Sequence, residues 1–188
     1  MNDTLKTIKQ RYSCRSFVNG KMPDDASLNA IAQAAIEAPS GVNRQHWHIS
    51  MVKNSTLISQ MEAEGMLLLS SMPDKSLYQR IMGRGGKLFY NAPCMAVIAI
   101  KEASPKGAEL IDLGIVAQNI VLAASSLGIA NVHCGLAAFC FAGEKAAEFK
   151  EKLQFPQGYE FGIAVLLGYA TAPSAPHLPD KNKVSFVE

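Results

Sequence analysis

The sequence predicts an α+β fold in one domain, and three observations carry this prediction. Short apolar runs, Cys94–Ile100 and Phe161–Gly168, are typical of strands buried on both faces. The stretch Leu110–Leu127 is apolar nearly all round, which predicts a central buried helix. Amphipathic helical stretches occupy most of the remaining chain. Three or four strands would therefore form a small sheet inside a helical shell.

Composition limits the classes of protein to consider. The chain has 188 residues, which suits one domain over 1–188, and its hydrophobic content of 48% is ordinary for a globular protein. A formal net charge of +2 is too small to favour nucleic acid as the main partner. The long apolar run from Leu110 contains Asp112, Gln118 and Asn119, which are costly in a bilayer, so a buried helix is favoured over a membrane span.

The cysteines and the N-terminus predict a cytoplasmic protein. The first residues, MNDTLKTIKQR, contain no apolar signal-peptide core. No two cysteines form a CxxC pair, so zinc is not expected, and each lies in or beside an apolar run, as buried free thiols do. A reduced compartment is the simpler interpretation for all of them: Cys14, Cys94, Cys134 and Cys140.

In the first half of the chain, the predicted elements are helices around one strand. Asn2, Asp3 or Thr4 can cap a short helix. Acidic residues after Pro23 predict a second helix, which Pro39 ends. The following elements are a strand over Trp47–Lys53, a helix capped by Ser55 or Thr56 and broken at 70–73, and a helical piece from Asp74 to the glycines at 83–86. The stretch 53–90 is either a mobile lid or a surface excursion without function.

In the second half of the chain, the predicted helices alternate with strands or extended pieces. A loop over Lys101–Gly107 precedes the apolar helix, which Gly128 ends. The tail, Tyr169–Glu188, has no clear period. The other predicted elements are an extended piece over Ala130–Leu136 and a helix over Glu144–Leu153.

General catalytic motifs are absent from the sequence. GxGxxG, GxxxxGK[ST], GxSxG and HExxH do not occur. His46 and His48 share a strand face and could form half of a metal site, although a polar strand face is favoured. His133 and Cys134 precede Gly135 and are either reactive or simply packed beside a turn. Nothing in the sequence shows what would lower the pKa of that thiol.

Two clusters carry more specific information. Arg11 and Arg15 bracket Ser13, a combination suited to holding phosphate, although two arginines four apart also occur on solvated helix faces. Pro39-Ser40-Gly41 is a loop of small residues that a flat ring could approach closely, or an ordinary turn.

Together the clusters resemble motifs of the nitroreductase family. RYSCRSF is similar to that family's RRSxRxF, and APSGVNRQHWHI is similar to APSxxNxQPWxF. The stretch from Asp112 to Ile129 resembles DxGxAxQNxxLAAxxLGL. Further matches in the same order run from about residue 8 to 187: Asn91-Ala92-Pro93 before an apolar strand, Gly168-Tyr169 after the last strand, and Lys181-Asn182-Lys183 as the basic end.

The resemblance implies a small, mostly antiparallel sheet wrapped by helices, and a homodimer with a large helical interface. It implies noncovalent FMN at that interface. Arg11, Tyr12, Ser13 and Arg15 would contact the phosphate, the ribityl chain and the pyrimidine edge. Lys181 and Lys183 would close on the phosphate. Pro39, Ser40, Gly41 and Asn43 match the loop of the other subunit, and Cys134, Gly135 and Leu136 match the backbone facing flavin N5.

The activity implied is transfer of hydride from NAD(P)H, through FMN, to a nitroaromatic, a quinone or another conjugated small-molecule acceptor. FMN would carry the chemistry, so no catalytic side chain and no metal are expected. The alternatives are a reductive dehalogenase or ene-reductase of the same family, or a non-catalytic flavin store or sensor. Two positions depart from the family: His46 replaces a proline, and Leu136 replaces a second glycine, which could crowd the approach to N5.

Overall fold

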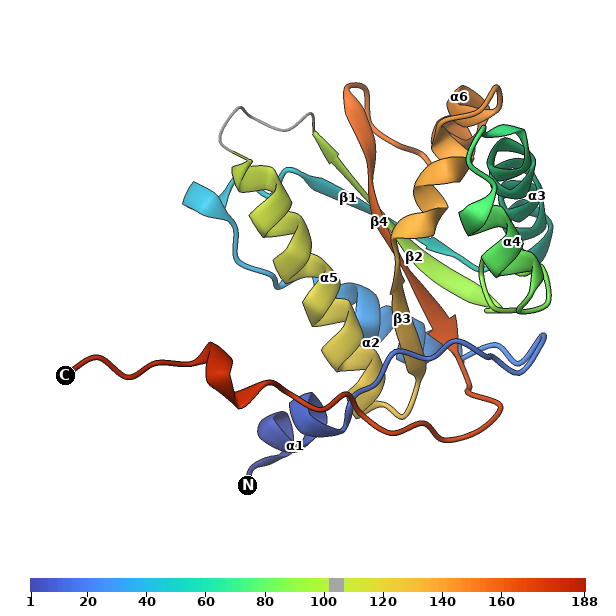
Figure 1. The fold of residues 1–188 in the computed structure, drawn as a ribbon. Coiled ribbons are helices and arrows are strands. Elements are labelled where there is room, and N and C mark those ends of the chain that lie inside the picture. Colours follow the sequence, from blue (N-terminus) through green and yellow to red (C-terminus); the bar gives the residue numbers. More distant parts are fainter. Residues whose placement is uncertain (102–106) are drawn as a thin grey trace.

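The computed structural model describes residues 1–101 and 107–188, and Figure 1 shows its arrangement. Most of the loop expected at 101–107 lies outside the described residues. The helices are α1 (Asp3–Gln10), α2 (Asp25–Ile36), α3 (Ser55–Ser71), α4 (Ser76–Met82), α5 (Ala108–Ser126) and α6 (Ala146–Lys152). The strands are β1 (Trp47–Val52), β2 (Cys94–Lys101), β3 (Ala130–Cys134) and β4 (Tyr159–Gly168). Short 3-10 helices are η1 (Gly41–Asn43), η2 (Gly135–Phe141) and η3 (Lys181–Lys183).

The sheet confirms the predicted fold class. Its four strands are ordered β1-β2-β4-β3, and every neighbouring pair is antiparallel. Both central strands are apolar, as expected for strands covered on both faces. In β2, every residue except the last, Lys101, is buried.

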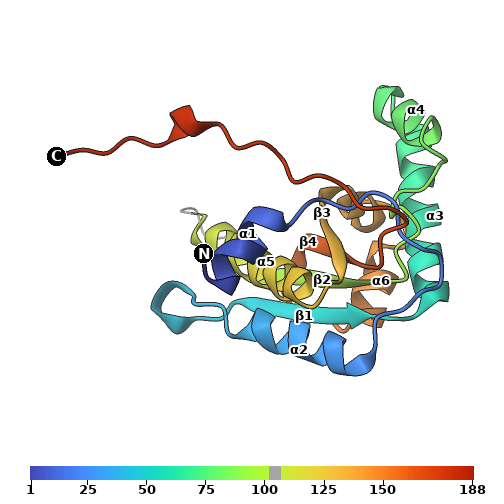
Figure 2. The same ribbon diagram turned by 90° about the horizontal axis from the view of Figure 1, so that it is seen from below.

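Alternation along β2 divides the core into two clusters. Cys94, Ala96 and Ile98 face a cluster formed with α2 and α5. Met95 and Val97 face the other cluster, which contains residues of α3, α4, η2 and α6. The period-2 geometry of a strand thus gives the sheet two helical layers. Figures 1 and 2 show α5 and α2 on one side, and α3 and α6 on the other.

Gly162 lets α5 pack closely on the sheet. A Cβ built on this glycine would lie 2.8 Å from Leu113 Cδ1 and 3.0 Å from the Ile98 carbonyl oxygen. The β2–β4 register shifts between Ile98 and Ala99, beside this contact. A residue without a Cβ at a bulge is a usual solution where another element approaches a strand closely.

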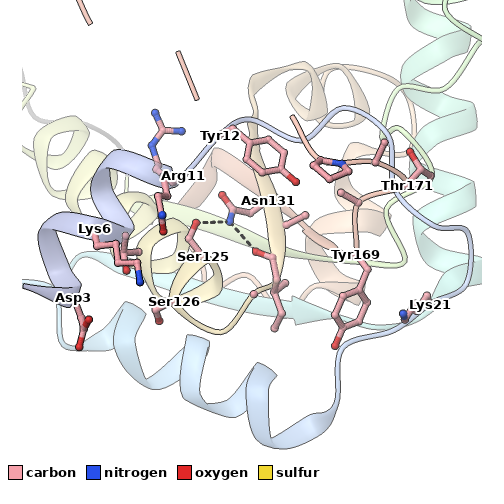
Figure 3. A pocket seen from close by; sticks show the side chains of 18 residues that line it. Asp3, Lys6, Arg11, Tyr12, Lys21, Ser125, Ser126, Asn131, Tyr169 and Thr171 are labelled. Atoms are coloured by element: carbon pink, nitrogen blue, oxygen red, sulfur yellow. Dashed lines mark hydrogen bonds between the residues drawn. The ribbon is translucent and has the colours of Figure 1, made fainter. Parts of the chain in front are cut away.

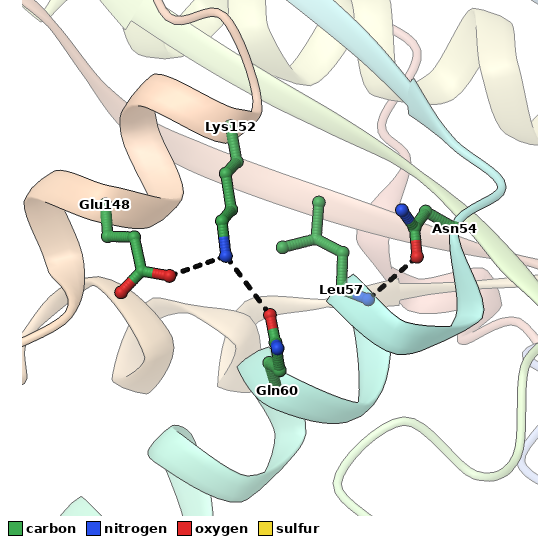
Figure 4. A network of polar contacts seen from close by, with 5 residues as sticks. All are labelled: Asn54, Leu57, Gln60, Glu148 and Lys152. Atoms are coloured by element: carbon green, nitrogen blue, oxygen red, sulfur yellow. Dashed lines mark hydrogen bonds and ion pairs between the residues drawn. The ribbon is translucent and has the colours of Figure 1, made fainter.

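The helix boundaries follow local capping. The Asp24 side chain accepts a hydrogen bond from Ser27 N at 2.7 Å, as the acidic start after Pro23 predicted. For α3 the predicted cap was wrong by one or two residues: Asn54, and not Ser55 or Thr56, accepts from Leu57 N at 3.0 Å. Figure 4 shows this cap and the link from α6, where Lys152 Nζ lies 2.5 Å from Glu148 and 3.3 Å from Gln60 of α3.

The region 53–90 is partly integrated into the core. Met61, Leu69 and Ile81 are almost completely buried. Helix α3 and one face of α4 therefore belong to the core cluster that Met95 and Val97 face. The prediction of a surface excursion does not describe α3. A lid formed by the exposed remainder stays a prediction.

Several apolar surfaces remain uncovered. Leu5 and Ile8 of α1 are 53% and 46% exposed, so the described residues cover these two apolar side chains only in part. Leu110 and Ile111 of α5 are 56% and 67% exposed. Helix α5 is long and apolar enough to span a bilayer by composition, and 44% of its most apolar 18-residue window is buried within the protein. From Thr171 onward every residue is exposed, and the tail leads away from the body (Figures 1 and 2).

Candidate functional site

The segment that contains the arginine cluster is fixed beside β3. Ser13 forms an isolated parallel bridge with Asn131, and Cys14 N donates to the Asn131 carbonyl oxygen at 2.9 Å. Further along, Phe17 N donates to the Tyr90 carbonyl oxygen at 3.1 Å, and the Phe17 side chain is buried. These backbone hydrogen bonds fix the path of the chain from Ser13 to Phe17.

The side chains of this segment present positive charge without a compensating carboxylate. Arg11 is partly buried and Arg15 is exposed, and Arg15 Nη1 donates to the Ser13 carbonyl oxygen at 3.4 Å. Among the described residues, neither arginine forms an ion pair. Burial raises the pKa of the Tyr12 hydroxyl, and the nearby Cys14 raises it further. The arrangement can hold a phosphate or another anion.

The C-terminal end of β3 lies next to this segment. The strand stops at Cys134, so the extended piece predicted to Leu136 was two residues too long, and Gly135 begins η2. Arg11 also approaches the ring of His133. Desolvation lowers the pKa of His133, the Ala117 carbonyl raises it, and the charge of Arg11 lowers it.

Cys134 and Gly135 face different surroundings. The Cys134 side chain is 3% exposed and lies in the core cluster, and burial raises its pKa to about 11. Its thiol is therefore protonated at neutral pH and unsuited to nucleophilic attack. Gly135 is exposed, and a Cβ built on it would meet no heavy atom within 4 Å. Leu136 packs partly against the core cluster, so its side chain is directed toward the protein.

These residues fit a bound flavin. Gly135 leaves open space over exposed backbone, and the adjacent segment carries two guanidinium groups that form no ion pair with any described residue. A flat ring needs close approach to backbone, and its phosphate needs cations. The described residues contain no group of three His, Cys, Asp or Glu side chains that could hold a metal ion.

The loop from Pro39 to Gln45 is built around Ser40. Asn43 N donates to the Ser40 carbonyl oxygen at 3.0 Å, and Gln45 N donates to Ser40 Oγ at 3.0 Å. Gly41 N donates to Oδ1 of the buried Asp112 on α5 at 3.2 Å.

This loop also carries unusual backbone strain. The φ angles of Val42, Asn43 and Gln45 are 49°, 56° and 51°, in the left-handed region that β-branched valine rarely adopts. Val42 is nevertheless 85% exposed, so its side chain gains little packing against the described part of the chain in return for this conformation. Strained backbone of this kind clusters at functional sites.

One chain brings together only part of the residue set predicted from the sequence. In both Figures 1 and 2, α5 separates the Pro39–Asn43 loop from β3. Lys181 and Lys183 lie in η3 of the projecting tail, and Lys183 is 4.0 Å from Asp180. Arg11, Tyr12, Ser13, Arg15, Cys134, Gly135 and Leu136 thus form one group, whereas the loop and the two lysines stand apart.

The structure adds a residue pair that sequence reasoning missed. Arg84 Nη1 donates to the Tyr90 hydroxyl at 2.7 Å, and its guanidinium lies 4.4 Å from the centre of that ring. Its charge lowers the pKa of Cys134, which places Arg84 near the end of β3. Tyr90 and Asn91 have φ angles of 53° and 63°. In the sequence, the glycines at 83–86 and the possible lid over 53–90 marked this stretch, and neither identifies a pair of contacting side chains.

Comparison with known proteins agrees with this geometry. A model of the nitroreductase family matches residues 8–169. A crystal structure of a nitroreductase with bound FMN from Desulfitobacterium hafniense is 54% identical, with a TM-score of 0.95 and complete coverage of both chains. A second nitroreductase with bound FMN, from Bacteroides fragilis, is 25% identical, has a TM-score of 0.89 and also covers both chains completely.

A curated relative from Methanothermobacter thermautotrophicus bears the name of a candidate NADH dehydrogenase/NAD(P)H nitroreductase. It is 29% identical over 136 residues, which is 71% of this chain and 61% of that relative. The arginine segment beside β3, the antiparallel sheet and the family match all agree, and the chain belongs to the nitroreductase family.

Proposed function

We propose that this chain is a flavin oxidoreductase that binds FMN and transfers hydride equivalents from NAD(P)H to a small conjugated acceptor. Nitroaromatics and quinones are the acceptor classes to test first. The observation that carries the proposal is the fixed Arg11–Arg15 segment beside the open backbone at Gly135. The family match and the FMN-bound relatives support the same cofactor.

The residues of Arg11–Arg15 and Cys134–Leu136, called the inner group, have separate tasks. Arg11 and Ser13 hold the phosphate and the ribityl oxygens, because a guanidinium and a hydroxyl supply charged and neutral donors. Arg15 lies at the pyrimidine edge, where a fixed positive charge stabilises negative charge on the reduced ring. Gly135 leaves room for the ring and offers its backbone N–H. When bound, FMN supplies the hydride-accepting and hydride-donating chemistry.

We further propose that the active unit is a homodimer in the cytoplasm. The strained loop at Val42, the apolar face of α5 and the exposed tail all lack cover within one chain. A second copy would cover apolar surface and bring Pro39–Asn43 toward the flavin of its neighbour. Lys181 and Lys183 would complete the phosphate site once the tail is held in place.

The test begins with the visible spectrum of the purified protein after addition of FMN. We expect flavin bound at one per chain, and oxidation of NADH or NADPH only when an acceptor is present. The alternative of a flavin store predicts binding without turnover. A panel of nitroaromatic, quinone, halogenated aromatic and enone acceptors separates the nitroreductase reaction from the dehalogenase and ene-reductase reactions. Absence of FMN binding would contradict the proposal itself.

A further inference from the structure

Arg84 and Tyr90, in the chain between α4 and β2, form a pair that lies outside the cleft beside Arg11. That cleft has a volume of about 760 Å³ and lies between α1, the end of α5, the start of β3 and the chain after β4. Figure 3 shows Arg11 and Tyr12 among its lining residues. Neither Arg84 nor Tyr90 lines it. The pair is therefore separate from the arginine to which the phosphate of FMN is assigned.

Backbone contacts hold Tyr90 beside the inner group. The Tyr90 carbonyl oxygen accepts a hydrogen bond at 3.1 Å from the backbone N–H of Phe17, which follows Arg15 by two residues. The Tyr90 side chain packs against the core cluster that contains Phe17 and Cys134. Its φ angle of 53° lies in the left-handed region, which costs such a residue about 1–3 kcal/mol and persists only where the surrounding structure imposes it. The fold, and not a loose loop, therefore sets the position of Tyr90.

Tyr90 in turn orients the guanidinium of Arg84. The hydrogen bond from Arg84 Nη1 to the Tyr90 hydroxyl measures 2.7 Å, and Arg84 Cζ lies 4.4 Å from the centre of the ring. A planar guanidinium that is already held in this way loses less conformational freedom when it binds a ligand. Arg84 is exposed, and among the described residues its side chain forms no other hydrogen bond and no ion pair. Its remaining N–H groups are therefore free to bind an acceptor atom of a ligand.

The charges around Arg84 leave it without a carboxylate partner in the described part of the chain. Arg84 and Glu62 of α3 both act on the Cys134 thiol, because Arg84 lowers its pKa and Glu62 raises it. Glu62 has other partners, however. Its Oε1 accepts from Phe89 N at 2.9 Å, and its Oε2 lies 3.4 Å from Lys87 Nζ. The positive charge of Arg84 thus remains available to an anion near the end of β3.

We propose that Arg84 is a specificity-determining residue that favours acceptors carrying a carboxylate, such as nitroaromatic acids. This inference rests on the proposed function and adds the class of acceptor to it. The planar fork of a guanidinium matches the two oxygens of a carboxylate, and Tyr90 holds that fork in one orientation. An acceptor stacked on the flavin beside Gly135 would direct its carboxylate toward Arg84, while its reducible group lies over the ring.

The test compares two acceptors of the same shape, 4-nitrobenzoate and the uncharged 4-nitrobenzamide, in steady-state turnover of the FMN-loaded protein. Arg84→Ala should raise the KM for 4-nitrobenzoate about 10-fold, near the lower end of the range for hydrogen bonds to charged groups, because Arg84 is exposed. Its kcat, and the KM for 4-nitrobenzamide, should change little. Tyr90→Phe should have a smaller effect in the same direction, since the ring remains and only the hydroxyl acceptor is lost. The matched control is Lys87→Ala, which removes a cation that is paired with Glu62 and should leave both KM values unchanged.

A second measurement requires no turnover. Benzoate should perturb the visible spectrum of the bound flavin, and Arg84→Ala should weaken benzoate about 10-fold at unchanged flavin content. Equal benzoate affinity and equal KM for 4-nitrobenzoate in the native and Arg84→Ala proteins, with turnover intact, would overturn this inference and leave the proposed function standing. A rise in the KM for NADPH alone would also overturn it, because Arg84 would then contact the nicotinamide nucleotide. Absence of FMN binding would overturn the proposed function and this inference together.

Discussion

The two groups of residues predicted to bind flavin differ in how the chain holds them. The inner group, Arg11–Arg15 with Cys134–Leu136, is fixed by backbone bonds to Asn131 and Tyr90. The outer group, Pro39–Asn43 with Lys181 and Lys183, is exposed except for the half-buried Ser40, and it lies on the far side of α5 or in the projecting tail. One chain therefore holds the inner group in a fixed arrangement, whereas its outer group lies apart from the inner group. The inner group should determine whether flavin binds, and the outer group should depend on the dimer.

The largest expected effect is at Gly135. Gly135→Val should abolish flavin binding while the melting temperature of the flavin-free protein changes little, because a Cβ at this position meets no heavy atom within 4 Å. Gly135→Ala should show a smaller loss. The matched control is Gly162→Val, which should destabilise the protein itself, since its Cβ would lie 2.8 Å from Leu113. Full flavin content in Gly135→Val would remove this residue from the site.

The second expected effect compares an inner with an outer cation. Arg11→Ala should weaken FMN by about 1.5–3 kcal/mol, the range for hydrogen bonds to charged groups. Lys181→Ala should weaken it by less than about 1 kcal/mol, because an exposed charge is screened by solvent. Fluorescence titration of flavin-free protein measures both. An equal or reversed order would contradict the division into inner and outer groups.

A smaller effect is expected where the outer loop is anchored. Asp112→Ala removes the acceptor for Gly41 N, and it should weaken FMN only about two- to tenfold, as loss of one hydrogen bond does. An unchanged FMN affinity in Asp112→Ala would contradict a role for this anchored loop at the flavin. Equilibrium dialysis against FMN measures this directly.

The smallest effect on activity is expected at Cys134. Cys134→Ala should keep most of the turnover, because the thiol is buried and hydride transfer needs no nucleophile. Loss of turnover with flavin retained would instead indicate covalent chemistry at the thiol. Alkylation of the native protein at neutral pH should be slow, which peptide mapping would show.

The buried thiols also predict a dependence of stability on pH. Burial raises the pKa of Cys134 from 9.0 to about 11, and the pKa values of Cys94 and Cys140 to about 12. Above pH 9 the unfolded chain releases these protons while the folded chain keeps them. The free energy of unfolding should therefore fall as pH rises from about 9 toward 12. Urea denaturation at several pH values should show a shallower fall in Cys94→Ala with Cys140→Ala.

The sequence was most informative where one pattern had one physical solution. The unbroken apolar run from Cys94 predicted a central strand, and Gly128, with a φ of 72°, ends α5 as expected. It was less informative for η2, because GLAAFCF has neither strand alternation nor a helical period. The left-handed residues Val42 and Tyr90 could not be predicted, since neither residue type favours that conformation.

For the site, sequence reasoning found the inner residues through a resemblance, and the structure supplied what connects them. Neither spacing nor composition indicated that Asn131 would join Ser13 to β3, or that Asp112 would hold the Pro39 loop. Both are long-range contacts made by the fold. The apolar character of α5 was predicted, but the exposure of Leu110 and Ile111 follows only from the folded chain.

The most direct test of the two-part site is sedimentation velocity followed at the visible absorbance of the flavin. For the native protein we predict that all flavin absorbance moves with a species of about twice the chain mass of 20.2 kDa. Ile111→Glu, which places a charge on the exposed face of α5, should yield monomers that sediment without flavin, whereas Lys9→Glu should behave like the native protein. A monomer that carries flavin at full occupancy would contradict the account.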